Sequence, residues 1–159
     1  MSRLLFAGRT IIVTGAGGGL GKAYALEFAR RGGNILVNDL GGSLAGEGKN
    51  KSAAGLVVEE IVKNGGKAVA NYDNVATEGD KIVEHALKHF GGVDVVVNNA
   101  GILRDKSFHK MTKEDWNSVL NVHLNGTFAV SFAAWPFMME KKYGRIVNVG
   151  SGLLMLAAL

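Results

Sequence analysis

Hydrophobic residues in this chain gather into short continuous runs that recur along its length, each preceded by basic residues and glycine. Four runs share this order, at residues 35–37, 68–70, 93–97 and 146–149. The segments before them are Arg30-Arg31-Gly32-Gly33, Lys63-Asn64-Gly65-Gly66, Lys88-His89-Phe90-Gly91-Gly92 and Lys142-Tyr143-Gly144. Basic residues suit the negative end of a helix, and glycine suits the left-handed position after it. The pattern therefore predicts helices that end just before buried strands.

These runs are continuous rather than alternating, which is typical of strands covered by helices on both faces. With an opening run at residues 11–13, the chain holds five strand–helix units. Such a succession favours an α/β fold with a doubly wound parallel sheet. A chain of 159 residues suits one domain with a proper core and is too short for two.

Three segments depart from this regular pattern. Residues 41–53 are rich in Gly, Ser, Lys and Asn, and we expect a flexible insertion between the second strand and its helix. Thr112 is predicted to cap a helix whose first turn holds carboxylates. Further along, Pro136 predicts a kink or a break, and a break near Asn125-Gly126 would divide the segment into two helices.

The first run leads into a glycine-rich turn that opens a helix. The turn reads Thr14-Gly15-Ala16-Gly17-Gly18-Gly19-Leu20-Gly21. Unpaired backbone N–H groups and the positive end of the helix dipole make such a turn a site for phosphate. Gly15 is predicted to permit the tight turn and Gly19 to let a pyrophosphate approach the backbone. Gly21 is predicted to let the helix pack closely on the strand.

A carboxylate, Asp39, ends the second strand about twenty residues after the glycine turn, where a dinucleotide fold binds the ribose hydroxyls. It would repel a 2′-phosphate, and neither Leu40 nor Gly41 supplies a positive charge to attract one. Gly18 likewise brings no charge into the turn. The pattern indicates NAD rather than NADP as cofactor. An aspartate that merely ends the strand and caps a turn is the alternative.

Two side-chain amides end the fourth run, in the segment Val97-Asn98-Asn99-Ala100-Gly101. The segment lies next to the switch point of the sheet, where ligands bind in such folds. Amides followed by small residues suit a backbone that approaches a planar ring and holds its neighbours by hydrogen bonds. A strand-to-loop turn in which Asn adopts unusual backbone angles explains these residues equally well.

Polar residues also interrupt the apolar pattern of the predicted helix after Thr112. A buried amide without a partner costs about 1–3 kcal/mol, so we expect Asn121 to hold an ordered water or a backbone carbonyl. His123 is expected to serve in helix packing. The remaining histidines, which we expect at the surface, are His85, His89 and His109. No two of the four have convincing metal-ligand spacing, and Asp and Glu residues do not cluster with them, so no metal is predicted.

Composition narrows the possible functions. The chain is 47% hydrophobic and 20% charged, and the absence of cysteine excludes a disulfide framework and thiolate chemistry. Its net charge of +4 is dispersed, which favours a solvated surface over nucleic-acid binding; a basic rim would weakly help to steer an anionic substrate. No apolar run is long enough to cross a membrane, and no signal peptide precedes Arg9-Thr10. We expect a soluble intracellular protein.

Together these segments resemble the short-chain dehydrogenase/reductase family over nearly the whole chain. The matching motifs are Thr14-Gly15-x3-Gly19-x-Gly21, Asn98-Asn99-Ala100-Gly101, Asn121-Val122-x-Leu124-x-Gly126, and Gly144-Arg145-Ile146-Val147-Asn148 before Ser151. The resemblance implies an oxidoreductase with a Rossmann-type doubly wound parallel sheet, of which residues 1–159 form the NAD-binding part and the first five strands.

Finer features resemble the peroxisomal branch of this family, which oxidises (3R)-3-hydroxyacyl-CoA to 3-oxoacyl-CoA with NAD in fatty-acid β-oxidation. These features are Val37-Asn38-Asp39-Leu40-Gly41-Gly42, Lys67-Ala68-Val69-Ala70-Asn71-Tyr72-Asp73, Gly101-Ile102-Leu103-Arg104-Asp105 and Lys142-Tyr143-Gly144-Arg145-Ile146. The resemblance implies an acyl-CoA substrate, a peroxisomal location and a homodimer for the complete domain.

The resemblance also implies roles for particular residues. Cofactor contacts would come from Thr14, Gly15, Gly19, Leu20, Gly21, Asp39, Asp73, Asn74, Asn99, Ala100 and Gly101. Among them, Asp73 would contact the adenine, and Asn99 to Gly101 would line the adenosine ribose. Of the catalytic residues, Asn121 would hold the water of a proton relay. Ser151 would orient the substrate hydroxyl, although an ordinary turn serine fits its setting between two glycines as well.

The family's acid–base pair, Tyr-x-x-x-Lys, would begin beyond Leu159. Tyr143 with its neighbouring lysines does not replace the pair, because it precedes the fifth strand and belongs to the other end of the sheet. The last strands and the helix that usually supports dimerisation would also lie beyond Leu159. We therefore expect these 159 residues alone to show little or no dehydrogenase turnover and to dimerise poorly.

Several alternatives remain open from the sequence. The chain could be the N-terminal piece of a hydroxyacyl-CoA dehydrogenase, a dinucleotide-binding module that occupies the dimer interface of a full-length partner, or an unstable fragment. A short-chain dehydrogenase for steroids or other alcohols is a further alternative. The apolar tail 152–159 departs from the family and ends in Ala157-Ala158-Leu159, which is a poor peroxisomal signal. Beside it, an open sheet edge would invite aggregation.

Overall fold

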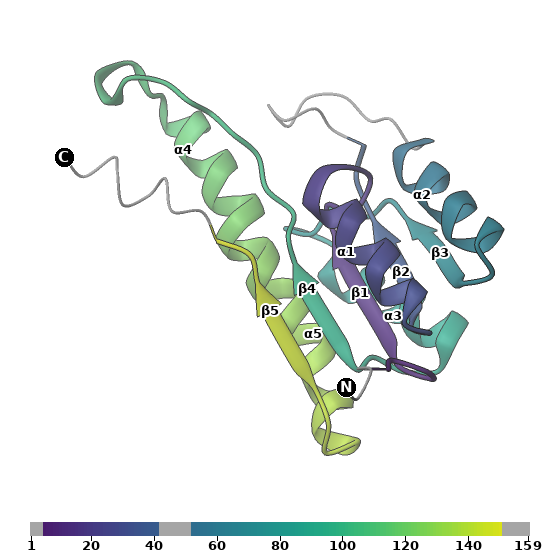
Figure 1. Cartoon of the computed structure of the whole chain (residues 1–159). Helices are drawn as coiled ribbons and strands as arrows, with labels where there is room; N and C mark the ends of the chain where they lie inside the picture. The colour runs from purple at the N-terminus through teal and green to yellow at the C-terminus, as the bar shows by residue number, and fades with distance from the viewer. Residues whose placement is uncertain (1–4, 42–51, 151–159) are drawn as a thin grey trace.

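A computed structural model describes residues 5–41 and 52–150 as a five-stranded parallel sheet in the order β3-β2-β1-β4-β5 (Figure 1). The first half holds β1 (Thr10–Thr14), α1 (Gly19–Arg30), β2 (Asn34–Asn38), α2 (Ser52–Lys63) and β3 (Lys67–Asn71). The second half holds α3 (Gly79–Phe90), β4 (Val95–Asn98), the 3₁₀ helix η1 (Phe108–Lys110), α4 (Lys113–Leu120), the π-helix η2 (Asn121–Asn125), α5 (Gly126–Glu140) and β5 (Arg145–Asn148). The predicted α/β doubly wound parallel sheet is confirmed.

Helices cover both faces of the sheet, and alternate residues of each strand point to opposite sides. On one face, Ile11 and Val13 of β1 pack in a cluster with residues of α1 and α2. On the other face, Ile12 packs in a cluster with residues of α3 and α5. In Figure 1, α1 lies in front of the sheet and α5 lies behind β4 and β5. Strand β1 is therefore buried on both sides.

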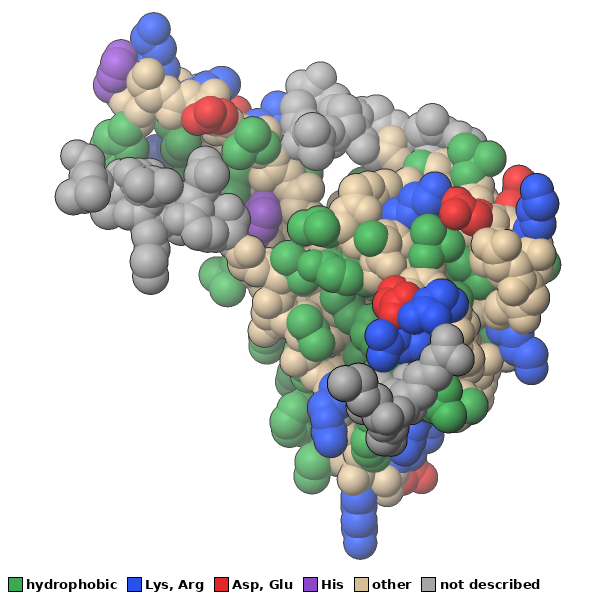
Figure 2. All heavy atoms as spheres, in the orientation of Figure 1, with side chains coloured by type: hydrophobic (Ala, Val, Ile, Leu, Met, Phe, Trp, Pro, Cys, Tyr) green, Lys and Arg blue, Asp and Glu red, His purple; other side chains and the backbone are tan. Residues whose placement is uncertain are grey.

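The edge strands are less buried than the continuous runs predict. Strands β1 and β4 are buried throughout, whereas β3 is largely half-buried and β5 is mostly exposed. On β5, Val147 is 46% exposed. Figure 2 shows hydrophobic side chains gathered on this part of the surface, left of centre in the view. The residues of β5 are exposed because this strand lies at the edge of the sheet, where no described strand pairs with its outer side.

Glycine ends three of the four predicted helix-to-strand segments in the left-handed conformation. Gly32, Gly65 and Gly91 have φ values of 90°, 81° and 75°. In the fourth segment the prediction is wrong, because Lys142 takes the left-handed position with φ of 51°. Gly144 serves packing instead, since a Cβ there would lie 2.5 Å from the sulfur of Met138.

The helical region between β4 and β5 begins as predicted but is not broken. The Thr112 hydroxyl accepts a hydrogen bond from the Asp115 amide at 3.1 Å, and the Asp115 carboxylate accepts one from the Thr112 amide at 3.2 Å. Instead of a break at Asn125-Gly126, the π-helix η2 joins α4 to α5. A π turn accommodates an extra residue while the hydrogen bonding continues. Helix α5 also runs unbroken through Pro136.

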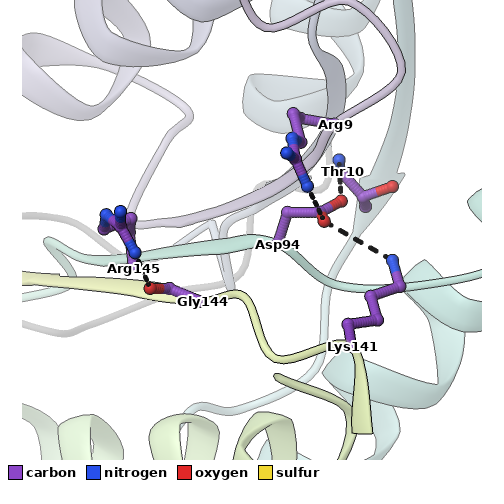
Figure 3. A network of polar contacts seen from close by, with 6 residues as sticks. All are labelled: Arg9, Thr10, Asp94, Lys141, Gly144 and Arg145. Carbon is purple, nitrogen blue, oxygen red and sulfur yellow. Dashed lines mark hydrogen bonds and ion pairs between the residues drawn. The ribbon is translucent and has the colours of Figure 1, made fainter. Parts of the chain in front are cut away.

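One buried carboxylate ties the amino ends of the central strands together (Figure 3). The side chain of Asp94 is only 3% exposed. Its Oδ1 lies 3.0 Å from Arg9 Nη1 and 3.5 Å from Lys141 Nζ, and its Oδ2 accepts from the Thr10 amide at 2.8 Å. Arg9 also lies over the ring of Tyr143, 3.7 Å from its centroid. Asp94 thus joins β1, β4 and the end of α5.

Replacing this carboxylate should destabilise the fold. We expect Asp94→Ala to lower the free energy of unfolding by about 2 kcal/mol, because the buried Thr10 amide loses its acceptor and two cations lose their partner. Urea denaturation followed by circular dichroism measures the change. Glu84→Ala, at an exposed position of α3, is the control and should stay within about 0.5 kcal/mol of wild type. Equal stability of the two variants would contradict the role given to Asp94.

Candidate functional site

A row of polar side chains crosses the sheet where its parallel strands end. Strand β1 ends in Thr14, and the other four strands end in Asn38, Asn71, Asn98 and Asn148. The register places Thr14 opposite Asn38, Asn38 opposite Asn71, and Asn98 opposite Asn148. Asn38 Nδ2 donates to Asn71 Oδ1 at 2.7 Å, and Asn98 Nδ2 donates to Asn148 Oδ1 at 2.9 Å. The carboxyl edge of the sheet is therefore a continuous polar rim.

The glycine turn lies at the centre of this rim, between β1 and α1. Gly15 and Gly19 have φ values of 62° and 51°, which favour glycine. A Cβ at Gly15 would lie 2.8 Å from Ala100 Cα, and one at Gly21 would meet the Gly15 carbonyl and lie 2.5 Å from Asn99 Nδ2. The predicted tight turn and close helix–strand packing are confirmed.

The outer side of the same turn is open. A Cβ on Gly19 would meet nothing within 4 Å. Gly18 is the N-cap of α1, and no side chain caps the helix there. The neighbouring Leu20 is 63% exposed. The first N–H groups of α1 thus face space that no side-chain cap occupies, which is the arrangement that binds phosphate in other proteins.

Thr14 and the segment after β4 hold the turn in place. The Thr14 hydroxyl accepts hydrogen bonds from the amides of Asn99 and Ala100, both at 3.0 Å. Asn99 Nδ2 donates to the carbonyl oxygens of Thr14 at 3.0 Å and Gly15 at 3.1 Å. No described Asn has a positive φ, so the alternative of unusual backbone angles at these residues is wrong. The Asn99 side chain instead supports the turn through hydrogen bonds.

Asp39 approaches the glycine turn from the end of β2. Its Oδ2 accepts from the Gly17 amide at 2.8 Å, and its Oδ1 accepts from the Gly41 amide at 2.7 Å. The carboxylate therefore does cap its own turn, as the alternative explanation required. It also binds the glycine turn, and each carboxylate oxygen keeps acceptor capacity for a further hydroxyl.

A pocket opens at the ends of β2 and β3, beside the glycine turn. This β3 pocket has a volume of about 620 Å³ and is lined by Leu40, Ala70, Asn71, Tyr72, Asp73, Asn74, Thr77, Glu78 and His85. Asp73 Oδ2 accepts from Asn71 Nδ2 at 2.7 Å. Asn74 Oδ1 accepts from the Ala76 amide at 2.9 Å and so shapes the turn before α3. Both predicted cofactor residues after β3 thus line one pocket.

His85 was expected at the surface, and that prediction is wrong. The residue is half-buried, and its Nδ1 lies 3.0 Å from Asn71 Nδ2. Burial, followed by the nearby His89, holds the pKa of His85 below its ordinary value of 6.5. Helix α3 carries it toward the sheet one turn after the buried Ile82 and beside Ala86. An isolated histidine in an amphipathic helix gave no signal for this position.

The candidate catalytic residues lie apart from this cluster. Asn121 begins η2 and is exposed rather than buried, and its Oδ1 accepts from Asn125 Nδ2 at 2.8 Å. His123 was expected in helix packing, but it is exposed, and its Nε2 lies 3.1 Å from N and 2.9 Å from O of Ile102 in the loop after β4. The ring also limits the space beside Gly101. Ser151, residues 42–51 of the predicted insertion and the tail 152–159 lie outside the described residues. The predicted end of the insertion at residue 53 is wrong, because α2 already begins at Ser52.

Sequence reasoning missed four polar contacts that support this edge. Asn38 and Asn71, each about 2% exposed or less, and the half-buried His85 form one chain of hydrogen bonds. Asn98 is 5% exposed and donates to Ser131 Oγ at 2.9 Å as well as to Asn148. The available signal was the recurrence of Thr or Asn at the carboxyl end of each apolar run, at Thr14, Asn38, Asn71, Asn98 and Asn148.

Two negative findings concern the described part of the chain. In residues 5–41 and 52–150, no three His, Asp or Glu side chains lie together so that they could hold a metal ion. None of the helices formed by these residues is long and apolar enough to cross a membrane.

Comparison with known proteins identifies the family. Residues 9–155 match the family model described as short chain dehydrogenase. The chain is 59% identical over 148 residues to the peroxisomal hydratase-dehydrogenase-epimerase of Saccharomyces cerevisiae, with 93% of this chain and 16% of that protein covered. It is 58% identical over 150 residues to the peroxisomal multifunctional enzyme type 2 of Mus musculus, with 94% of this chain and 20% of that protein covered.

Among solved structures, a short chain dehydrogenase from Mycobacterium avium has the same fold. Its TM-score is 0.83 at 42% identity, over 94% of this chain and 54% of that one. The chain thus spans about half the length of that structure, and about a fifth or less of the two multifunctional enzymes.

The close contact at Gly21 can be tested with two variants of the glycine turn. We expect Gly21→Ala to lower the free energy of unfolding by about 1–3 kcal/mol, because its Cβ would collide with the Gly15 carbonyl. Gly18→Ala is the matched control: its φ of −164° suits any residue and a Cβ would meet nothing within 4 Å. Chemical denaturation of both variants measures the difference. A Gly21→Ala protein as stable as Gly18→Ala would disprove the close contact.

Proposed function

Because this chain belongs to the short-chain dehydrogenase family, we propose that it binds NAD for the oxidation of a (3R)-3-hydroxyacyl-CoA to the 3-oxoacyl-CoA in fatty-acid β-oxidation. The observation that carries the proposal is the contact of the Asp39 carboxylate with the Gly17 amide. It brings an acidic group to an open glycine turn at a helix N-terminus, which is how dinucleotide folds hold a ribose beside a pyrophosphate.

In this proposal the open glycine turn and the β3 pocket divide the cofactor between them. The pyrophosphate lies over Gly19 and the first N–H groups of α1. Asp39 accepts hydrogen bonds from the ribose hydroxyls and repels a 2′-phosphate, so that NAD is preferred to NADP. Asp73 contacts the adenine in the β3 pocket, with Asn74 beside it, and Asn99, Ala100 and Gly101 line the adenosine ribose.

The chemistry is supplied by the nicotinamide, which accepts a hydride from the carbinol carbon when it is bound. The residues of this chain orient the reactants. Asn121, in the π-helical segment, holds the water of the proton relay, and Ser151 orients the substrate hydroxyl. No tyrosine follows Ser151 within the 159 residues, so we propose that these residues bind the cofactor and have little turnover on their own.

The acyl-CoA substrate and the location rest on the relatives. The enzymes of yeast and mouse are both named peroxisomal, and the yeast enzyme is named a hydratase-dehydrogenase-epimerase. We therefore place the activity of this chain in the peroxisome. The net charge of +4 would help to attract an anionic CoA ester.

The sequence led us to expect poor dimerisation of these residues, but helix α5 exposes an apolar face, and we therefore propose that a second copy of the chain covers it. This α5 stripe consists of residues spaced by three and four, namely Leu124 at the end of η2 and Phe128, Phe132, Trp135 and Met139 of α5, with exposures of 62%, 64%, 69%, 55% and 62%. The rings of Phe128 and Phe132 stack with centroids 5.3 Å apart. Opposite faces of α5 are thus apolar, since Val130 and Ala134 pack on the sheet. A large exposed apolar patch marks an interaction site.

Asp39 provides the test of the cofactor proposal. We expect Asp39→Ala to weaken NADH binding by about 1–3 kcal/mol, because it loses the bonds to the ribose hydroxyls. The same change should weaken NADPH binding less or improve it, because it removes the repulsion of the 2′-phosphate. Fluorescence titration with both cofactors measures the two affinities.

The ratio of the two affinities separates recognition from folding. Damage to the turn would weaken both cofactors alike, whereas loss of recognition changes the NADH-to-NADPH preference. Asp105→Ala, at an exposed position between β4 and η1, should change neither affinity. Tighter binding of NADPH than NADH by the wild-type chain would contradict the proposal.

The α5 stripe predicts that the chain forms a dimer. A single charged residue placed on the stripe should prevent this dimer from forming. We expect Phe132→Glu to convert a wild-type dimer to a monomer, because a carboxylate cannot be buried without a partner. Sedimentation velocity measures the state. Leu56→Glu, at another hydrophobic position that is 61% exposed on α2, is the matched control and should remain a dimer. A monomeric wild-type chain at high concentration would refute the assignment.

A further inference from the structure

The side-chain amide of Asn71 has only one orientation that fits its surroundings. Its Oδ1 lies 3.1 Å from the backbone N–H of Asp73, which can only donate. Its Nδ2 lies 2.7 Å from Asp73 Oδ2, a carboxylate oxygen that accepts. Exchanging the two ends of the amide would set donor against donor and acceptor against acceptor. The orientation is therefore determined by Asp73 alone.

This orientation determines the state of His85. Asn71 Nδ2 also lies 3.0 Å from His85 Nδ1, and it can only donate there. Nδ1 must therefore accept, so the ring is neutral and carries its proton on Nε2. With this bond all four hydrogen-bonding positions of the Asn71 amide are used, because Oδ1 also accepts from Asn38 Nδ2 at 2.7 Å.

The same chain of bonds holds Asp73 on three sides. Its amide donates to Asn71 Oδ1, its carbonyl accepts from Asn38 Nδ2 at 2.9 Å, and its Oδ2 accepts from Asn71 Nδ2. Two of these bonds depend on the Asn71 amide. Any change that turns this amide therefore displaces the Asp73 carboxylate from the wall of the β3 pocket.

We propose that neutral His85 is a positioning residue for the adenine end of the cofactor, acting through Asn71 on Asp73. The inference rests on the proposed function, which places the adenine in the β3 pocket. His85 itself lines this pocket, so the positioning group and the carboxylate it controls face the same ligand.

Protonation of His85 is incompatible with this arrangement. A proton on Nδ1 would point at the N–H of Asn71, and the bond between them would be lost. The imidazolium would then attract the Asp73 carboxylate, which Asn71 now holds. Loss of the bond to Asn71 and attraction to the imidazolium would each displace the Asp73 carboxylate from the wall of the β3 pocket. Cofactor affinity should therefore be full where His85 is neutral and should fall as the pH drops through the pKa of His85.

The charged surroundings of His85 agree with a neutral ring near pH 7. Burial and the charges of His89 and Lys88 lower the pKa of His85, while Asp73 opposes them. The rings of His85 and His89 lie 4.5 Å apart between centroids. Glu78, at the start of α3, lines the same pocket. The pH at which affinity falls is therefore below the ordinary 6.5 of histidine.

The test compares NAD⁺ affinities by calorimetry at about pH 8 and about pH 5, the range over which histidine titrates. The wild-type chain should bind about three- to tenfold more weakly at the lower pH, the equivalent of one lost hydrogen bond. His85→Phe keeps a ring without an acceptor, so it should show the weak affinity at both pH values. His85→Asn places an amide oxygen where Nδ1 lies, so it should bind as the wild type does at high pH and lose the pH dependence.

His89→Asn is the matched control on the next turn of α3. It removes an exposed histidine that does not line the β3 pocket. The pH dependence should remain in this variant and shift to higher pH, because the charge that lowers the pKa of His85 is gone. Loss of the pH dependence in His89→Asn, or its persistence in His85→Asn, would overturn the assignment to His85.

The outcomes separate this inference from the proposed function. Wild-type NAD⁺ binding that does not change between the two pH values would overturn the role of His85 and leave the cofactor proposal standing. No NAD⁺ binding at either pH would overturn the cofactor proposal and the role of His85 with it. Nitrogen NMR of the ligand-free chain tests the geometry directly: the proton should be on Nε2 of His85 at high pH, and a proton on Nδ1 would refute the orientation argued from Asn71.

Discussion

Five parallel strands that end at one edge impose the constraint on which the rest of this structure depends. Each strand leaves the buried sheet there, and its last side chain must satisfy polar groups in a region where apolar cover ends. The chain meets this need with Thr14 and four asparagines, which pair across strands and with the loops that follow. The rim that results is held together by hydrogen bonds within the protein.

The same contacts that complete the fold also shape the proposed cofactor site. Asn99 supports the glycine turn through two carbonyl oxygens, and Asp39 binds the turn through the Gly17 amide. Since these groups are held by backbone partners, their remaining hydrogen-bonding capacity points in fixed directions. Such preorganisation lowers the entropy lost when a ligand binds. The structural roles of these residues therefore coincide with the recognition roles proposed for them.

Helix α5 and the edge strand β5 show what the described residues leave uncovered. Helix α5 is apolar on two faces, and only one of them meets the sheet. Strand β5 forms an open edge beside it, with Val147 exposed. An apolar helix face and an unpaired strand edge are surfaces that proteins ordinarily cover. Both lie on the side where further chain or a second copy would pack.

Local patterns in the sequence determined the strands, the helix ends at Gly32, Gly65 and Gly91, the Thr112 cap and the glycine turn, because each depends on neighbours within a few residues. The spacing after the glycine turn predicted a carboxylate at the end of β2, but not the bond of Asp39 to the Gly17 amide. Only the tertiary structure decided that β5 is exposed, that Lys142 rather than Gly144 is left-handed, and that Asn121 lies at the surface. It also decided that His85 meets Asn71, because that contact joins a helix to a strand and depends on how the two pack. Periodicity shows which face of an element is buried, whereas the partner that a polar side chain meets depends on the packing of elements distant in sequence.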